Sequence, residues 1–164
     1  MGAREDGAGW MLANGVSFAD GGLASCRRNT ASSFAASSAY FSRALGGNAR
    51  NAFVAAANTG AVLLLDAYGG AVDDVPAGAT AFVHRDARFS VQLLSYAAAA
   101  TARARVRAAR SRIAPFGNGQ AYQNYPDPTL PDPPQAYYGA NLPRLRSIKA
   151  AVDPEGRFPR SFAG

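Results

Sequence analysis

The stretch that decides the fold is "RFSVQLLSYA", residues 88–97, in which every second side chain from Phe89 to Leu93 is strongly apolar. Successive side chains of a strand point to opposite faces of a sheet. One face therefore carries Phe89, Val91 and Leu93. The other carries Ser90, Gln92 and Leu94. We predict a strand packed against a core on its first face, with Gln92 directed away from that core, toward either solvent or a polar cavity.

Two neighbouring stretches are expected to supply further strands, and a third is left open. The apolar run "AVLLLDAYGG" (residues 61–70) ends in two glycines and predicts a buried strand. The segment "TAFVHR" (residues 80–85) predicts a second strand, joined to residues 88–97 by a tight turn near Asp86. The segment "SSFAASSAYFSRAL" (residues 32–45) is expected to be extended or a short helix.

Helices are predicted on both sides of the central strand in the chain. Asn48 is expected to cap a helix over residues 49–57. Residues 97–115 favour a helix by composition. Its packed seam should consist of Ala102, Val106, Ala109 and Ile113. A last helix is expected over residues 140–154, with Leu145, Ile148 and Val152 inward. Strands followed by helices, without regular βαβ alternation, predict an α+β domain with an antiparallel sheet flanked by helices.

Charge and composition narrow the classes of function. The chain has 164 residues, 48% of them hydrophobic, and this length and composition suit one globular domain. Its net charge is +6 and its pI is near 10.0. The densest basic run, "ARARVRAARSR" (residues 102–112), contains no aromatic residue on which a base could stack. We therefore expect a solvated helix face there, and no nucleic-acid partner.

The scarcity of Cys and His excludes several sites. With one cysteine (Cys26) and one histidine (His84), the chain cannot form an intrachain disulfide or a Cys/His metal cage. A nucleophilic Cys–His pair has no supporting motif. No apolar run reaches the ~20 residues of a membrane span, and the N-terminal residues do not resemble a secretory signal. The expectation is a soluble, cytoplasmic protein with no metal site and no membrane partner.

Tyrosines are concentrated near the end of the chain. The segments "AYQNYPD" (residues 121–127) and "AYYGAN" (residues 136–141) hold four of the seven tyrosines. Between them, "PDPTLPDPPQ" (residues 126–135) is half proline and is expected to be stiff and extended. Taken alone, Tyr122 and Tyr125 fit core aromatics with satisfied hydroxyls as well as they fit a site.

The order of these motifs resembles the C-terminal half of the berberine bridge enzyme-like FAD-linked oxidases, flavoenzymes with a PCMH-type FAD-binding domain. The resemblance extends over residues 32–158 and is strongest over residues 120–158. Its pieces are Tyr122-Gln123-Asn124-Tyr125, Tyr137-Tyr138-Gly139-Ala140-Asn141, Arg144-Leu145, Asp153-Pro154 and Phe158. The tryptophan that often precedes Tyr-Tyr-Gly in the family is absent here.

The resemblance implies roles for four residues. In the family the Tyr-x-Asn-Tyr segment is a strand that lies along the flavin, which implies a catalytic Tyr122 with Asn124 and Tyr125 beside the cofactor. A free tyrosine has a pKa near 10, so a tyrosine base needs a lowered pKa or a partner. Gln92 matches a Gln or Glu that faces the cavity; as a glutamine it can orient a substrate hydroxyl but cannot act as a base.

Other residues are given structural roles by the same resemblance. His84 lies in "VHRD", which matches a Pro-His-Arg-type segment, and is expected to be structural. We expect Tyr137, Tyr138 and Asn141 to anchor the final helix.

The resemblance also implies what this chain lacks. The family's FAD-binding domain, with its phosphate-binding loop and flavin-linking His and Cys, has no counterpart in the sequence, so we expect a fragment, a split subunit or a truncated product. The resemblance divides the chain into an unassigned stretch (residues 1–31), a partial substrate-binding domain (32–119) and a berberine bridge enzyme-type C-terminal segment (120–164).

Two functions remain open. The first is the substrate-side part of an FAD-dependent oxidase of alcohol groups on a sugar, glycoside or natural product, inactive alone and partnered by an FAD-binding domain from the same or an adjacent gene. The second is a non-catalytic remnant or binding module that retains the fold.

Overall fold

The computed structural model describes residues 34–158, and the N-terminal stretch with Cys26 lies outside this range. Three strands and four α-helices follow one another along the described chain. In order they are β1 (Ala35–Phe41), α3 (Gly47–Ala57), β2 (Val62–Ala67), β3 (Phe89–Ser95), α4 (Ala99–Ile113), α5 (Pro133–Tyr138) and α6 (Leu142–Val152). Short 3-10 turns lie at Gly70–Val72, Ala114–Phe116 and Gly139–Asn141.

The predicted central strand is the centre of the sheet. The strand order is β1-β3-β2, and both pairings are antiparallel. The register places Gln92 of β3 between Ser38 of β1 and Leu64 of β2. Residues 35–41 thus form a strand, and the predicted α+β class with an antiparallel sheet is confirmed.

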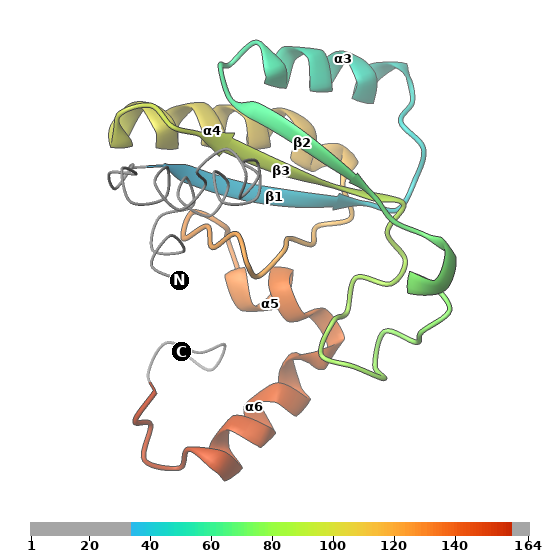
Figure 1. Cartoon of the computed structure of the whole chain (residues 1–164), viewed down its shortest axis with the longest axis vertical. Helices are drawn as coiled ribbons and strands as arrows, with labels where there is room; N and C mark the ends of the chain where they lie inside the picture. The colour runs from blue at the N-terminus through green and yellow to red at the C-terminus, as the bar shows by residue number, and fades with distance from the viewer. Residues whose placement is uncertain (1–33, 159–164) are drawn as a thin grey trace, which may run out of the picture.

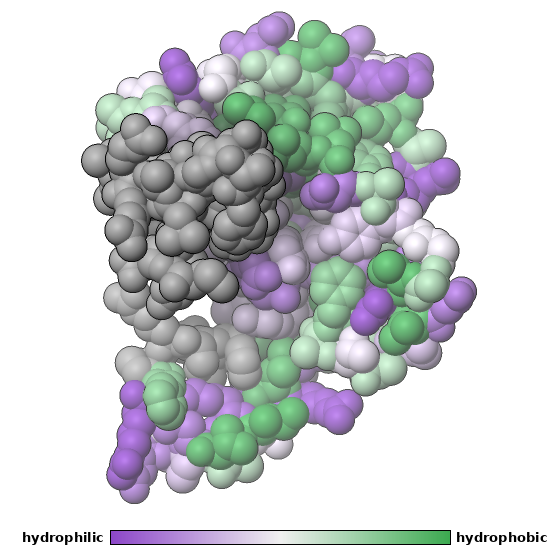
Figure 2. Space-filling view, viewed as in Figure 1, coloured by the Kyte–Doolittle hydropathy of each residue, from purple (hydrophilic) through white to green (hydrophobic). Residues whose placement is uncertain are grey.

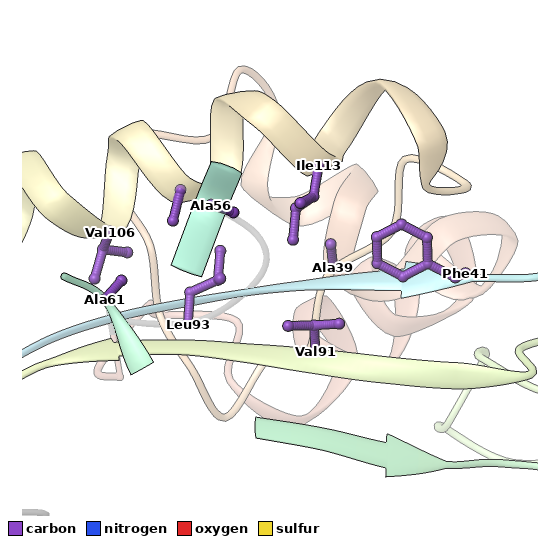
Figure 3. Packing of buried hydrophobic residues seen from close by; sticks show 9 residues of the cluster. Ala39, Phe41, Ala56, Ala61, Val91, Leu93, Val106 and Ile113 are labelled. Atoms are coloured by element: carbon purple, nitrogen blue, oxygen red, sulfur yellow. The ribbon is translucent and has the colours of Figure 1, made fainter. Parts of the chain in front are cut away.

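The core lies between the sheet and the two helices α3 and α4. Figure 3 shows Val106 and Ile113 of α4 directed toward Leu93, Val91 and Ala39 of the strands. All four residues of the predicted α4 seam are buried. Phe41 extends this cluster, since its ring stacks on that of Phe89 with centroids 4.7 Å apart. The alternation predicted for β3 is therefore correct.

Two predicted features of the sheet are wrong. β2 is not buried: Val62, Leu64 and Leu65 are 48%, 41% and 56% exposed, because β2 is an edge strand. Figure 2 shows hydrophobic side chains gathered on this part of the surface. Residues 80–85 are not a strand. Arg85 holds them instead, through hydrogen bonds to the carbonyls of Phe82 and Val72, both at 3.2 Å.

Helix ends also differ from expectation. Helix α3 begins at Gly47 after an N-cap at Gly46 that makes no side-chain cap, so Asn48 is not the capping residue. The proline-rich stretch is not extended throughout. Asp132 caps α5 by accepting a 3.1 Å hydrogen bond from the Gln135 N–H, and the helix then begins with Pro133 and Pro134.

The C-terminal helix lies apart from the main core. Figure 1 shows α5 and α6 beyond the β1 side of the sheet, away from α3. Consequently Ile148 and Val152 are 47% and 73% exposed, which corrects their predicted inward positions. Within residues 34–158, no helix is long and apolar enough to cross a membrane.

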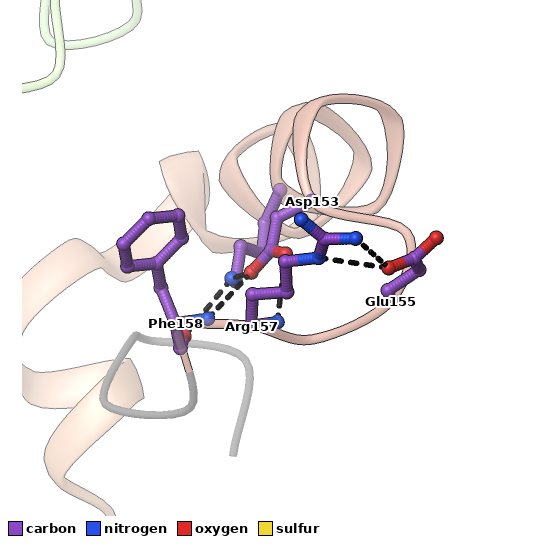
Figure 4. A network of polar contacts seen from close by, with 5 residues as sticks. Asp153, Glu155, Arg157 and Phe158 are labelled. Carbon is purple, nitrogen blue, oxygen red and sulfur yellow. Dashed lines mark hydrogen bonds and ion pairs between the residues drawn. The ribbon is translucent and has the colours of Figure 1, made fainter.

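The turn after α6 is closed by polar contacts (Figure 4). Asp153 forms an ion pair with Lys149 and accepts hydrogen bonds from the backbone N–H groups of Arg157 (2.8 Å) and Phe158 (3.0 Å). Lys149 also donates to the Phe158 carbonyl at 3.0 Å. One carboxylate therefore fixes the direction of the chain after the helix.

Candidate functional site

The tyrosine-rich segment starts beside the free edge of β1. The Asn118 N–H donates to the Tyr40 carbonyl at 2.9 Å, and the Tyr40 N–H donates to the Gln120 carbonyl at 3.2 Å. Gly117 makes this approach possible, because a Cβ at that position would lie 2.9 Å from the Tyr40 oxygen. The segment is thus held against the sheet at its beginning.

Beyond Gln120 the segment leaves the pattern of a strand, which corrects the expectation of a strand over Tyr122–Tyr125. The Tyr122 N–H donates to the hydroxyl of Ser38 at 2.7 Å rather than to a backbone carbonyl. The Tyr125 N–H then donates to the Tyr122 carbonyl at 3.0 Å and closes a turn. A side chain of β1 therefore replaces the backbone pairing that would have extended the sheet.

Asp127 fixes the far end of this turn. Its buried carboxylate accepts from the Ser37 hydroxyl at 2.5 Å and from the Thr129 hydroxyl at 2.6 Å. Its own N–H donates to the Tyr137 hydroxyl at 2.7 Å. Adjacent serines of β1, Ser37 and Ser38, thus hold the two ends of the tyrosine turn, residues 122–127.

The four predicted site residues come together around this turn. Asn124 donates from Nδ2 to the Tyr122 hydroxyl at 2.8 Å, and the rings of Tyr122 and Tyr125 meet edge to face at 5.3 Å. Gln92, Asn124 and Tyr125 line one cavity of about 560 Å³. Tyr122 does not line the cavity, but its hydroxyl accepts the hydrogen bond from Asn124, which does. Gln92 was predicted to face either solvent or a polar cavity, and in the structure it lines this cavity.

The cavity has walls from three parts of the fold. The paired ends of β1 and β3, the N-terminal half of α4 and the loop of residues 124–129 enclose it. Its size suits a small molecule, since ligand pockets span ~300–1,000 Å³. Within residues 34–158 no group of three His, Cys, Asp or Glu side chains could hold a metal ion.

An aromatic cluster behind the tyrosine turn was not predicted. Tyr40 of β1 stacks on His84 with centroids 4.0 Å apart, and its hydroxyl lies 3.3 Å from that of Tyr68. The ring of Phe82 packs near those of Tyr68 and Tyr122, with centroid distances of 6.2 Å and 6.4 Å. Tyr68 lies in "AYGG" (residues 67–70), Phe82 and His84 lie in "AFVH" (residues 81–84), and Tyr40 comes from β1, so no single stretch of the sequence signals the cluster.

His84 has the structural role expected of it. Its side chain is buried, and Nδ1 lies 2.9 Å from the Gln120 Oε1. Burial lowers the pKa of His84, and the Gln120 hydrogen bond, Asp86 and the Tyr137 backbone only partly oppose this effect. The imidazole therefore supports the base of the tyrosine turn as a neutral ring.

The hydroxyls of Tyr125, at the cavity wall, and of Tyr40, in the aromatic cluster, are held in the protonated form. Burial raises the pKa of Tyr125, and the negative charge of Asp66 adds to the rise. Burial and the Tyr68 hydroxyl also raise the pKa of Tyr40 far above its usual range. Both phenols are hydrogen-bond donors at neutral pH, so neither is suited to accept a proton.

Asn141, one of the three residues expected to hold the final helix, anchors it directly. Asn141 donates from Nδ2 to the carbonyls of Ala77 and Thr80, both at 3.0 Å, and so ties the start of α6 to the loop after β2. The Tyr137 hydroxyl holds Asp127, as described above. Tyr138 packs edge to face against Tyr137 at 6.2 Å.

Comparison with known proteins shows which family the chain resembles. Residues 121–160 match the family model described as "Berberine and berberine like". The Bacillus subtilis (strain 168) protein YvdP, an uncharacterized FAD-linked oxidoreductase, is 37% identical over 101 residues. That match covers 58% of this chain and 22% of YvdP, so the chain spans less than a quarter of this curated relative.

Solved structures share the fold over most of the chain. The Physcomitrella patens BBE-like 1 structure superposes with a TM-score of 0.73 at 33% identity, covering 84% of this chain and 32% of that protein. A glycopeptide hexose oxidase complexed with teicoplanin has a TM-score of 0.64 at 29% identity, covering 83% and 31% of the two chains. Together these matches show that the chain is similar to one portion of the berberine bridge enzyme-like FAD-linked oxidoreductases.

Proposed function

We propose that this chain forms the substrate side of a flavin active site that oxidises an alcohol group on a sugar, a glycoside or a related natural product. The observation that carries the proposal is the meeting of Gln92, Asn124 and Tyr125 at one cavity, with Tyr122 bonded to Asn124 behind it. The glycopeptide hexose oxidase among the similar structures supports an oxidised sugar group. Gln92 comes from the sheet and the other three from the turn, so the fold itself brings them together.

Each residue has a chemical task in this proposal. The Gln92 side chain offers both a donor and an acceptor to a substrate hydroxyl and positions it. The Tyr122 oxygen is the proton acceptor in this site. The Asn124 N–H donates to that oxygen and stabilises its phenolate form, which is the form that can accept the proton of the substrate hydroxyl. Tyr125 remains protonated and donates its hydrogen bond toward the cavity.

The residues present fit one edge of a flavin ring. Amide and phenol groups are the donors and acceptors that a ring with carbonyl and nitrogen atoms requires, and Asn124 and Tyr125 present them at the cavity wall. When bound, FAD supplies the acceptor for the hydrogen removed from the alcohol carbon. In our proposal the rest of the cofactor is held by an FAD-binding domain, and the isolated chain binds FAD weakly and is inactive.

The proposal is tested by joining the chain to an FAD-binding domain from a relative. The chain is fused to the portion of YvdP that lies outside the matched region, purified and examined for flavin absorbance near 450 nm. Glucose, cellobiose and chitobiose are then added without oxygen. We expect bound flavin in the fusion, none in the isolated chain, and bleaching of the flavin by at least one sugar.

Two results would count against the oxidase. A fusion that binds flavin but is reduced by no sugar or alcohol favours the non-catalytic binding module. An isolated chain that is purified with stoichiometric FAD contradicts the division of the site between two parts. A fusion of the same YvdP portion to its own C-terminal region serves as the control for folding and flavin loading.

A further inference from the structure

Two arginines of α4 form a positive wall of the cavity that the proposed chemistry does not use. Arg103 and Arg107 both line the cavity and are one helical turn apart. Neither guanidinium group makes a side-chain hydrogen bond or ion pair with any residue between 34 and 158. Like charges four residues apart on a helix repel each other, so this pair costs stability unless an anion lies between them.

The acidic residue in the cavity does not neutralise these arginines. Asp127 is the carboxylate among the lining residues, and it already accepts from Ser37 and Thr129. Burial lowers the pKa of Arg110, one turn farther along α4, and the charge of Asp127 partly opposes this effect. The positive charge of Arg103 and Arg107 is therefore available to a ligand, and a guanidinium remains charged at every physiological pH.

Away from Gln92, Asn124, Asp127 and Thr129, the remaining walls of the cavity are apolar or aromatic. Phe34 and Tyr96 lie at one end with ring centroids 6.2 Å apart. Leu94 of β3 and the rings of Pro126 and Pro128 continue the apolar surface. A ligand that fills the cavity thus meets apolar contacts over its body and two guanidinium groups at one side.

We infer that the cavity binds an organic anion, a small molecule with an apolar or aromatic body whose carboxylate or phosphate is held between Arg103 and Arg107. Guanidinium groups bind both acids well because their paired N–H groups match two acceptor oxygens. The inference rests on the proposed function where it assigns the anion to a substrate. The binding itself needs no flavin and is measurable on this chain.

The test compares matched ligands on the isolated chain. The ¹⁵N-labelled protein is titrated with phenylacetate and with its neutral isostere phenylacetamide, and amide shifts of β3, α4 and residues 124–129 are followed. We expect phenylacetate to bind about tenfold more tightly, since one hydrogen-bonded charge pair accounts for such a factor. The double substitution Arg103→Gln and Arg107→Gln should remove that preference and leave the helix content unchanged by circular dichroism.

The control removes the same charge elsewhere. Arg144→Gln with Arg146→Gln lowers the net charge equally on exposed positions of α6 and should keep the tenfold preference. Equal affinity of the two ligands, or loss of the preference in the α6 control, would overturn the inference. So would binding of inorganic phosphate as tight as that of phenylacetate, because the apolar walls would then contribute nothing.

A second pair of ligands separates the sources of the anion. FMN binding more tightly than riboflavin, with phenylacetate weaker than either, supports a flavin phosphate as the natural anion. Phenylacetate preferred over FMN supports a substrate acid. Binding of phenylacetate by the chain, together with a fusion that takes up no flavin, would leave this inference standing and the proposed function wrong; the reverse pattern would do the opposite.

Discussion

The two sides of strand β1 are held by different kinds of contact. Toward α3 and α4, its side chains enter a dry cluster of alanine, valine, leucine and isoleucine with phenylalanine at one end. Toward residues 118–129, the same strand uses hydroxyls and backbone groups: Ser37, Ser38 and the peptide of Tyr40. The first side supplies most of the burial that stabilises the sheet, and the second fixes the position of a segment that has no regular secondary structure.

This difference teaches how the site depends on the fold. In a packed core, the loss of one side chain lowers stability but leaves the fold in place, because many other contacts remain. A segment held by a few polar contacts changes its position when any one of them is lost. Substitutions on the two sides of β1 should therefore separate stability from site geometry.

The largest effect is expected in the core. Leu93→Ala should lower the free energy of unfolding by about 2–5 kcal/mol, because Leu93 is fully buried and its loss leaves a cavity. Urea denaturation followed by circular dichroism measures the change. Leu65→Ala on exposed β2 is the matched control and should change stability by less than about 0.5 kcal/mol. Equal losses in the two variants would show that the core has been placed wrongly.

A smaller loss, with a larger effect on the site, is expected at Asp127. Asp127→Asn weakens the contacts with Ser37 and Thr129 and should cost about 1–3 kcal/mol. The ¹⁵N shifts of residues 121–130 should change more than those of α3 and α4. Asp74→Asn, an exposed acid in the loop after β2, controls for charge. A uniform shift change across both regions would contradict the separation of the two sides.

The dependence of stability on pH should come from His84 as the pH falls from 7 toward 5. Burial lowers the pKa of the folded imidazole below its ordinary value of about 6.5, so the unfolded chain binds a proton first. The free energy of unfolding should therefore fall with falling pH, by at most ~1.4 kcal/mol per pH unit from one group. His84 is the only histidine, so His84→Gln should flatten the curve. A wild-type protein that gains stability toward pH 5 would contradict the assignment.

The smallest effect is a change of tyrosine titration. Removing the negative charge in Asp66→Asn should lower the pKa of Tyr125, because the Asp66 carboxylate now opposes the phenolate. Absorbance at 295 nm during an alkaline titration detects the shift, and Tyr125→Phe identifies which component moves. Asp73→Asn should leave the curve unchanged. No difference between Asp66→Asn and wild type would place Asp66 too far from the turn.

The elements with clear periodicity could be predicted from the sequence. The alternation at Phe89–Leu94 and the α4 seam follow from packing on one face, and the structure confirms both. The exposure of β2 could not be predicted in this way, since an apolar run has the same composition at a sheet edge as at its centre. The contact of Ser38 with Tyr122 joins residues 84 positions apart, and no local pattern records it.

The site was predictable in a different sense. The resemblance to the oxidases selected Tyr122, Asn124, Tyr125 and Gln92, and three of these four line one cavity. Their catalytic and cofactor-binding roles stay predictions. The strand implied for Tyr122–Tyr125 was wrong, because a serine hydroxyl satisfies the backbone there. The cluster of Tyr40, Tyr68 and His84 was missed, since its members come from three separate segments.

The most direct measurement of the central claim is the rate of flavin reduction in the fusion with YvdP, under anaerobic stopped flow with a reducing sugar. Tyr122→Phe and Gln92→Leu should each lower the rate constant, by about 10²–10⁴-fold for the tyrosine if it takes the proton. Flavin absorbance and stability should stay as in the parent fusion, and Arg144→Gln on the exposed face of α6 should leave the rate within a few-fold. Unchanged reduction in Tyr122→Phe and Gln92→Leu would show that this cavity is not the site of oxidation.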